Sequence, residues 1–314
     1  METVRKPIIT LPDLVGELPS QRSFLMGVAI LLVILFHCFS WVYNPIGAFN
    51  IGYIGVDIFL FLSGYGLSFS FEKNPLPRFY ANRLTRIFPL YFVAVTIGFI
   101  ICLKTWSVSD YLLNVFCVNY YINGNYFDWY VPTLIGLYLL FPLLYYLGKQ
   151  GWQAAAILFV IVFGILYFFQ VPDHYSCAIS RLPIFVYGIA IRRSPNYKPL
   201  LILGPLLFFP CWIWASHQLA TCIIAIPLIV LCLWLAPRIG KLKDAVAWCG
   251  KYSLELYLAN VLDWYILNYT YSPSGFAKLG FYLVLQVLFS GILIITNRLL
   301  QRAIQNTRKA PQRP

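Results

Sequence analysis

The sequence predicts an all-α fold, a polytopic integral membrane helix bundle of about ten transmembrane helices with the N- and C-termini cytoplasmic. The first observation behind this prediction is composition, because 60% of the 314 residues are hydrophobic and only 11% are charged. Soluble domains carry about 25% charged residues, so most apolar surface here must face lipid or other buried helices. The second is the distribution of positive charge. The third is the number of aromatic residues favoured at membrane interfaces, 9 Trp and 23 Tyr.

Apolar segments close to the roughly 20 residues that cross a bilayer recur along the whole chain. We predict spans at 24–42, 51–71, 87–104, 129–148, 152–170, 176–191, 199–215, 217–236, 252–269 and 276–298. The span at 176–191 is short and contains Arg181, so it would be tilted or shielded by its neighbours. Residues 107–123 could form an eleventh span, but this would invert every later loop. We interpret them as an outer loop with a helix at the interface.

The positive charges predict the topology. With a cytoplasmic N-terminus, the inner segments hold all of the 23 Lys and Arg residues except Lys104, Arg181 and Lys278. Cytoplasmic loops of membrane proteins show this excess, which explains the net charge of +12 without nucleic-acid binding. We therefore predict a cytoplasmic segment over 1–23 without a cleavable signal peptide, a membrane domain over 24–303 and a basic cytoplasmic tail over 304–314. The expected location is the cell (cytoplasmic or inner) membrane.

Two ionisable residues lie at matched depth in the first two predicted spans. His37 is thirteen residues beyond Phe24, roughly 20 Å from the inner face, and Asp57 is six residues into the second span, roughly 9 Å below the outer face. An ionisable group inside a bilayer costs at least about 2.5–3.5 kcal/mol, so it usually has a task or a partner. A carboxylate that orients an imidazole is the arrangement for general base catalysis. The alternative is a buried His–Asp pair that only joins two helices.

Other polar groups surround this pair in the sequence. Glycines near Ser63 give the second span a small-residue face, suited to close packing or to a substrate passing alongside. Arg78, Arg83 and Arg86 precede the third span; each alone would anchor to lipid phosphate, whereas three together could hold the diphosphate of a nucleotide-bearing acyl donor. Further candidates for lining a substrate cavity are Tyr65, Arg181 and Asp263. The eight Cys show no metal-site spacing, and we predict no metal.

Six segments resemble, in order and across nearly the whole chain, motifs of the membrane acyltransferase 3 family. This family transfers acyl groups, mostly acetyl, to sugars of cell-surface polysaccharides and related glycans. The segments are LMGVAILLVILFH, GYIGVDIFLFLSGYGL, RFYANRLTRIFPLYF, WYVPTLIGLYLLFPLLY, SRLPIFVYGI and GKYSLELYL. The resemblance implies a bundle of about ten helices and an acyl-CoA donor that approaches from the cytoplasm.

By the same resemblance, His37 matches the family's essential histidine. Asp57 and Ser63 match its second-helix motif, and Arg83 and Arg86 match its basic motif before the third helix. Two positions depart from the family pattern. Met26 stands where members often have an Arg, and Leu134 stands where many have a Glu.

The predicted function is transfer of an acyl group, expected to be acetyl, from acyl-CoA to a hydroxyl of a cell-surface polysaccharide or lipid-linked glycan. Acetyl-CoA or another acyl-CoA is a co-substrate rather than a permanently bound cofactor. We expect His37, oriented by Asp57, to deprotonate the hydroxyl, and Ser63 to stabilise the oxyanion. Two rivals are a transporter of a lipid-linked sugar or metabolite and a non-catalytic scaffold. A transporter more often shows broken spans repeated in its two halves, and we find no such symmetry.

Overall fold

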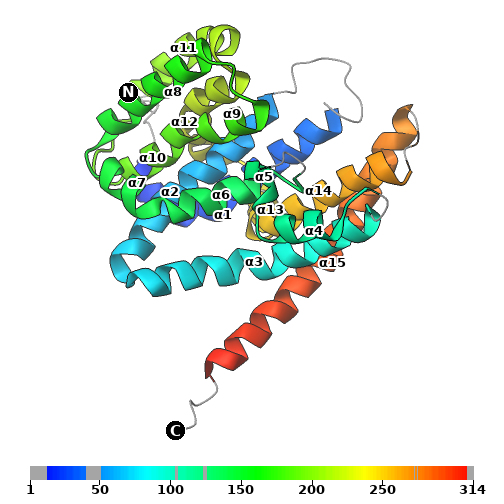
Figure 1. Ribbon diagram of the computed structural model, residues 1–314. Coiled ribbons are helices and arrows are strands. Elements are labelled where there is room, and N and C mark those ends of the chain that lie inside the picture. The colour runs from blue at the N-terminus through cyan, green and yellow to red at the C-terminus, as the bar shows by residue number, and fades with distance from the viewer. Residues whose placement is uncertain are drawn as a thin grey trace, which may run out of the picture.

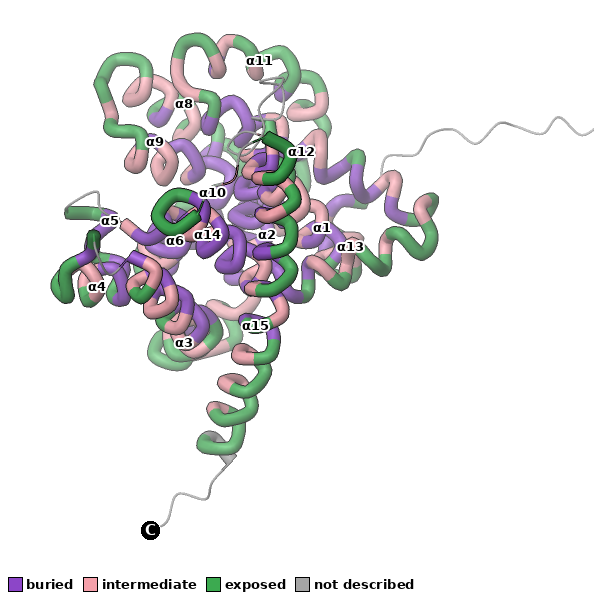
Figure 2. Tube along the Cα trace, turned by 90° about the vertical axis from the view of Figure 1, so that its right-hand side faces the viewer, coloured by how far each residue is buried: buried purple, intermediate pink, exposed green. Residues whose placement is uncertain are grey.

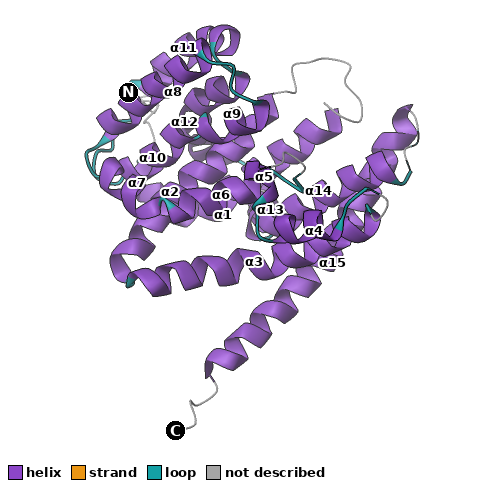
Figure 3. Ribbon diagram, in the orientation of Figure 1, coloured by secondary structure: helices purple, strands orange, loops and turns teal. Residues whose placement is uncertain are grey.

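The computed structural model describes residues 13–39, 51–102, 105–122, 126–271, 273 and 275–309. Within these ranges all regular structure is helical (Figure 3), so the predicted all-α class is confirmed. In chain order the elements are α1 Leu14–His37, α2 Ile54–Lys73, α3 Leu76–Ile101, α4 Val108–Val115, α5 Asn119–Ile122, α6 Tyr130–Leu139, α7 Phe141–Gly148, α8 Trp152–Phe168, α9 Asp173–Ile179, α10 Leu182–Ala190, α11 Leu200–Trp214, α12 His217–Leu235, η3 Ala236–Arg238, α13 Lys241–Lys251, α14 Ser253–Tyr269 and α15 Gly275–Lys309.

Fewer helices than predicted are long enough to cross a membrane. Among the described residues, α1, α2, α3, α12 and α15 meet the requirements of length and apolar composition. The pair α6 and α7 adds a sixth span if its 71° bend lies within one broken span, and α8 and α11 are shorter apolar helices. The structure therefore supports a membrane protein with five or six spans. The number ten, the cytoplasmic placement of both ends and the identity of the membrane stay predictions.

Two predicted spans are broken, and proline explains both breaks. Residues 176–191 form α9 and α10 instead of one helix, with Pro183 in the first turn of α10. Residues 129–148 form α6 and α7, with Pro142 in the first turn of α7. Proline lacks a backbone N–H and clashes with the preceding turn, so a helix usually starts anew there. The segment 107–123 contains only α4 and α5, both too short to cross a bilayer.

Three helices extend beyond the predicted spans. Helix α1 begins at Leu14, where the Asp13 side chain accepts from the Gly16 N–H at 3.2 Å. Helix α3 begins at Leu76, so the three arginines assigned to an inner loop lie on its first turns. Helix α15 continues to Lys309 and projects from the body (Figure 1). Residues 1–12 and 310–314 of the two predicted terminal segments, and residues 40–50 from the end of the first predicted span to the start of the second, lie outside the described residues.

The centre of the molecule is built on α2, which packs against α1, α10 and α12. Figure 2 shows buried residues concentrated in this centre, while the C-terminal part of α15 is exposed. Glycine permits the close helix approach: a Cβ on Gly64 would lie 2.2 Å from the Phe185 carbonyl oxygen, and one on Gly188 would lie 2.2 Å from the Phe61 carbonyl oxygen. Small residues allow this contact between helices in membranes. Packing therefore accounts for Gly64.

Candidate active site

One polar cavity contains three arginines and has a volume of about 250 Å³. We call it the basic cavity. It is lined by Arg22, Met26, Phe59, Ser63, Gly66, Leu67, Arg83, Arg86, Ile87, Tyr130, Leu134, Tyr138, Ser253, Leu254 and Tyr257. A polar cavity of about 490 Å³ adjoins it and shares Arg83, Arg86, Ser253 and Leu254. Because no carboxylate lines the basic cavity, it favours an anionic ligand.

The second cavity is larger, about 710 Å³, and contains His37. We call it the histidine cavity. Its polar lining comprises His37, Asp128, Asp173, His174, His217, Gln218 and Asn260. Its aromatic lining comprises Phe36, Tyr53, Tyr126, Phe127, Trp129, Tyr257, Trp264, Tyr265 and Tyr269. The combination of many aromatic faces and several hydrogen-bonding groups is suited to a polyhydroxylated ligand.

The two cavities lie at opposite ends of the same helices. On α1, Arg22 lines the basic cavity and His37 the histidine cavity, fifteen residues or about 22 Å further along. On α14, Ser253 lines the basic cavity and Tyr269 the histidine cavity. Tyr257 lines both. A reaction between a ligand bound in each cavity would therefore take place near Tyr257.

His37 has an amide neighbour rather than the predicted carboxylate. Asn260, from α14, lines the same cavity and lies within hydrogen-bonding reach of the imidazole. Two side chains of α15 fix the Asn260 side chain: its Nδ2 donates to the Tyr282 hydroxyl and to Gln286 Oε1, the latter at 3.2 Å. Gln286 is itself fixed because its Nε2 donates to the Leu256 carbonyl at 3.0 Å. This chain of contacts uses both N–H groups of Asn260, and its side-chain oxygen has no hydrogen-bond partner among the described residues.

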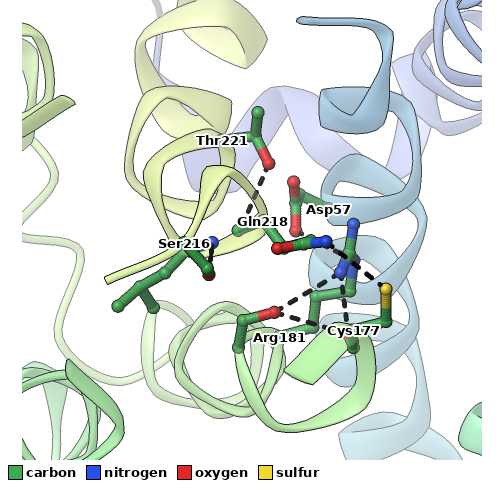
Figure 4. A network of polar contacts seen from close by, with 8 residues as sticks. Asp57, Cys177, Arg181, Ser216, Gln218 and Thr221 are labelled. Atoms are coloured by element: carbon green, nitrogen blue, oxygen red, sulfur yellow. Dashed lines mark hydrogen bonds and ion pairs between the residues drawn. The ribbon is translucent and has the colours of Figure 1, made fainter. Parts of the chain in front are cut away.

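Asp57 instead forms an ion pair with Arg181, and both side chains are fully buried (Figure 4). Arg181 Nε lies 3.5 Å from Asp57 Oδ1, and Arg181 Nη1 donates to the Cys177 carbonyl at 2.7 Å. The guanidinium also lies 4.7 Å from the centre of the Trp129 ring. Among the described residues Asp57 has Arg181 as its ion-pair partner, and neither of its carboxylate oxygens forms a hydrogen bond. The structure thus does not bring Asp57 and His37 together, and the pair lies behind the wall of the histidine cavity.

The remaining predicted residues divide between the basic cavity and the rest of the protein. Ser63, Arg83 and Arg86 line the basic cavity, whereas Arg78 is exposed and lines neither cavity. Tyr65 is buried, and its hydroxyl donates to the Val15 carbonyl at 3.3 Å outside both cavities. Ser63 therefore lies in the basic cavity rather than beside His37.

Asp263 is fully buried on α14, and its carboxylate oxygens have no hydrogen-bond partner among the described residues. It lies close to Cys38 and Tyr282. Since Tyr282 also binds Asn260, Asp263 belongs to the polar layer behind His37 rather than to a cavity lining.

Three residues of the site were not predicted as such. Arg22 lies in the segment 1–23, which we interpreted as polar and cytoplasmic, but it lies on α1 one turn before Met26. Asp128 precedes α6 and accepts from the Tyr257 hydroxyl at 2.6 Å. Asn260 could have been singled out by its amide within a predicted span, where a polar group needs partners.

The described part of the chain is thus an all-helical protein with candidate membrane spans, a histidine in one polar cavity and three arginines in another. The chain belongs to the acyltransferase 3 family, whose acyltransferase domain matches residues 24–296. It is also 27% identical over 199 residues to a protein of Acidianus two-tailed virus named "Putative acetyltransferase ORF330", covering 60% of this chain. The chain spans about half, 54%, of the length of that curated relative. No solved structure matches the chain.

Proposed function

We propose that this protein transfers a short acyl group, expected to be acetyl, from acyl-CoA to a hydroxyl of a surface polysaccharide or lipid-linked glycan. The observation that carries the proposal is that a basic cavity and a histidine cavity share one side chain, Tyr257. The donor would occupy the first and the acceptor the second. Membership of the acyltransferase family supports acyl transfer as the chemistry.

The basic cavity suits the donor. Coenzyme A carries a diphosphate and a further phosphate, and arginine binds phosphate bidentately. About 250 Å³ is too small for the whole molecule, so we assign the nucleotide to the adjoining cavity, where Arg83, Arg86 and Lys251 outnumber the one carboxylate, Glu255. The thioester arm would then extend past Ser63 toward Tyr257. This arrangement gives the arm a route along α14, so a covalent relay of the acyl group is not needed.

The histidine cavity suits the acceptor. Sugars present hydroxyl groups at their edges and C–H groups on their faces, which match hydrogen-bonding side chains and aromatic rings respectively. Asp128, Asp173 and Gln218 supply the former, and Trp129 and Trp264 the latter.

His37 would act as the general base. The Asn260 side-chain oxygen, which has no hydrogen-bond partner among the described residues, would accept from His37 and fix the imidazole tautomer, so that the other ring nitrogen takes the proton of the acceptor hydroxyl. The hydroxyl oxygen then attacks the thioester carbonyl carbon. The C–S bond breaks as the tetrahedral intermediate collapses, and the imidazolium returns the proton to the CoA sulfur. Acetyl-CoA and the sugar hydroxyl thus give the acetyl ester and the free CoA thiol.

The donor assignment predicts a specific kinetic effect of two arginines. In Arg83→Gln and Arg86→Gln we expect the KM for acetyl-CoA to rise about tenfold or more, since a lost charge-assisted bond to phosphate is worth about 1.5–3 kcal/mol. Arg78→Gln is the matched control on the same helix, because Arg78 lines neither cavity. The assay measures transfer from deuterated acetyl-CoA to membranes of a deletion strain, which supply the acceptor. An equal KM in all three variants and the wild type would contradict the donor site.

A further inference from the structure

The boundary between the two cavities is formed by a tyrosine held by one hydrogen bond. Tyr257 is 6% exposed, and its hydroxyl donates to Asp128 Oδ1 at 2.6 Å. The Asp128 carboxylate is in turn fixed by the backbone N–H groups of Tyr130 at 2.6 Å and Val131 at 3.2 Å. The Asp128–Tyr257 bond therefore joins the start of α6 to the middle of α14 between the cavities.

The residues on either side of this hydrogen bond line different cavities. Tyr130 lines the basic cavity, and its ring meets the Tyr257 ring edge-on at 5.0 Å. Asp128 and Trp129, immediately before it in the sequence, line the histidine cavity. Asp128 is only 4% exposed but lines the histidine cavity, so an acceptor hydroxyl bound there would compete with Tyr257 for its carboxylate.

In an acyltransferase, water competes with the acceptor hydroxyl as the nucleophile that attacks the thioester. Water is far more abundant than any sugar hydroxyl and would hydrolyse the thioester if it reached the carbonyl beside His37. A closed boundary keeps the thioester away from the histidine cavity until the acceptor is present.

Resting on the proposed function, we infer that Tyr257, fastened to Asp128, is the residue that makes the enzyme specific for a sugar hydroxyl over water. An acceptor hydroxyl that donates to Asp128 releases Tyr257 and opens the route to His37. Without the bond, the route is open before the acceptor arrives. Water then attacks the carbonyl carbon, the C–S bond breaks, and the products are acetate, a proton and the CoA thiol.

The test compares hydrolysis with transfer in purified full-length protein in lipid nanodiscs. We expect Tyr257→Phe, which keeps the ring and loses the bond, to release CoA from acetyl-CoA without acceptor at least tenfold faster than the wild type. Asp128→Asn, which weakens the same bond from the other side, should raise hydrolysis in the same direction. Tyr65→Phe is the control, because Tyr65 is also buried and loses a hydroxyl that binds a backbone carbonyl outside both cavities.

The outcomes separate this inference from the function on which it rests. If the wild type acetylates glycan in deletion-strain membranes and both Tyr257→Phe and Asp128→Asn hydrolyse no faster than it does, the role of Tyr257 is overturned and the function stands. A rise of equal size in Tyr65→Phe also overturns it. If the wild type transfers no acetyl group to these membranes, the proposed function fails and takes the inference with it. Should one variant fail to fold, the other decides.

Discussion

His37→Gln should lose transfer of acetyl groups to glycan by about 10²–10⁴-fold, the usual contribution of a general base. Glutamine approximates the size and polarity of the imidazole but takes up no proton. The arginines of the basic cavity are untouched, so the affinity for acetyl-CoA should stay within about twofold of the wild type. Rate and affinity are measured on the same purified protein, by transfer of deuterated acetyl and by calorimetry.

His217→Gln is the control for this experiment. His217 lines the same cavity as His37, but it begins α12 and is not adjacent to Asn260 in the described contacts. We expect an effect of less than about tenfold. Equal losses in the two variants would show that the cavity needs histidines for its shape or charge rather than one histidine as a base.

Asp57→Asn should destabilise the fold by about 3–5 kcal/mol, since it leaves the buried Arg181 guanidinium without its counter-charge. Removing both charges with Asp57→Leu and Arg181→Met together should recover most of this loss, because no isolated charge is then buried. Thermal unfolding of the protein in nanodiscs gives the comparison.

The chain supplies a matched surface pair as the control for Asp57. Arg192 and Glu72 form an ion pair at 2.6 Å with side chains about 30% exposed, so Arg192→Gln should cost less than about 1 kcal/mol. If Asp57→Asn were as stable as the wild type but inactive, the structural role of Asp57 would be contradicted. The original prediction that Asp57 orients the His37 imidazole would then be favoured.

The prediction that Asp57 contacts His37 was wrong, because depth along a helix does not determine which residues are in contact. The sequence placed Asp57 and His37 at the same height, but height does not determine the side of the helix. Neighbouring residues on an α-helix are turned by about 100°. Val56 lines the histidine cavity, and Asp57, the next residue, is directed to Arg181, which is distant in the sequence. The partner of a buried charge depends on tertiary packing that local spacing does not contain.

The two departures from the family pattern lie together in the structure. Met26 and Leu134, which stand where relatives often carry an Arg and a Glu, both line the basic cavity. The cavity therefore lacks one positive and one negative charge relative to that pattern, and Arg22, one turn before Met26, supplies a positive charge to the same space. The sequence showed each replacement separately. The fold shows that the missing positive charge and the missing negative charge belong to the same cavity, so their effects on its net charge cancel.

Composition predicted the helical class, and charge and resemblance singled out His37 and the arginines that the structure places on the first turns of α3. Breaks in the helices were harder to predict. The apolar runs 129–148 and 176–191 are continuous enough for single spans, yet Pro142 and Pro183 divide them. The second break allows Arg181 to sit between α9 and α10 and to reach Asp57 inside the bundle.

The most direct test of the proposed function is the O-acyl content of surface glycans, measured by mass spectrometry. The cells compared would carry the wild-type gene, a deletion, and the deletion complemented with His37→Gln. The two-cavity account predicts acyl groups in the first and their loss in the other two. The same acyl content in all three would contradict acyl transfer to surface glycans by this protein.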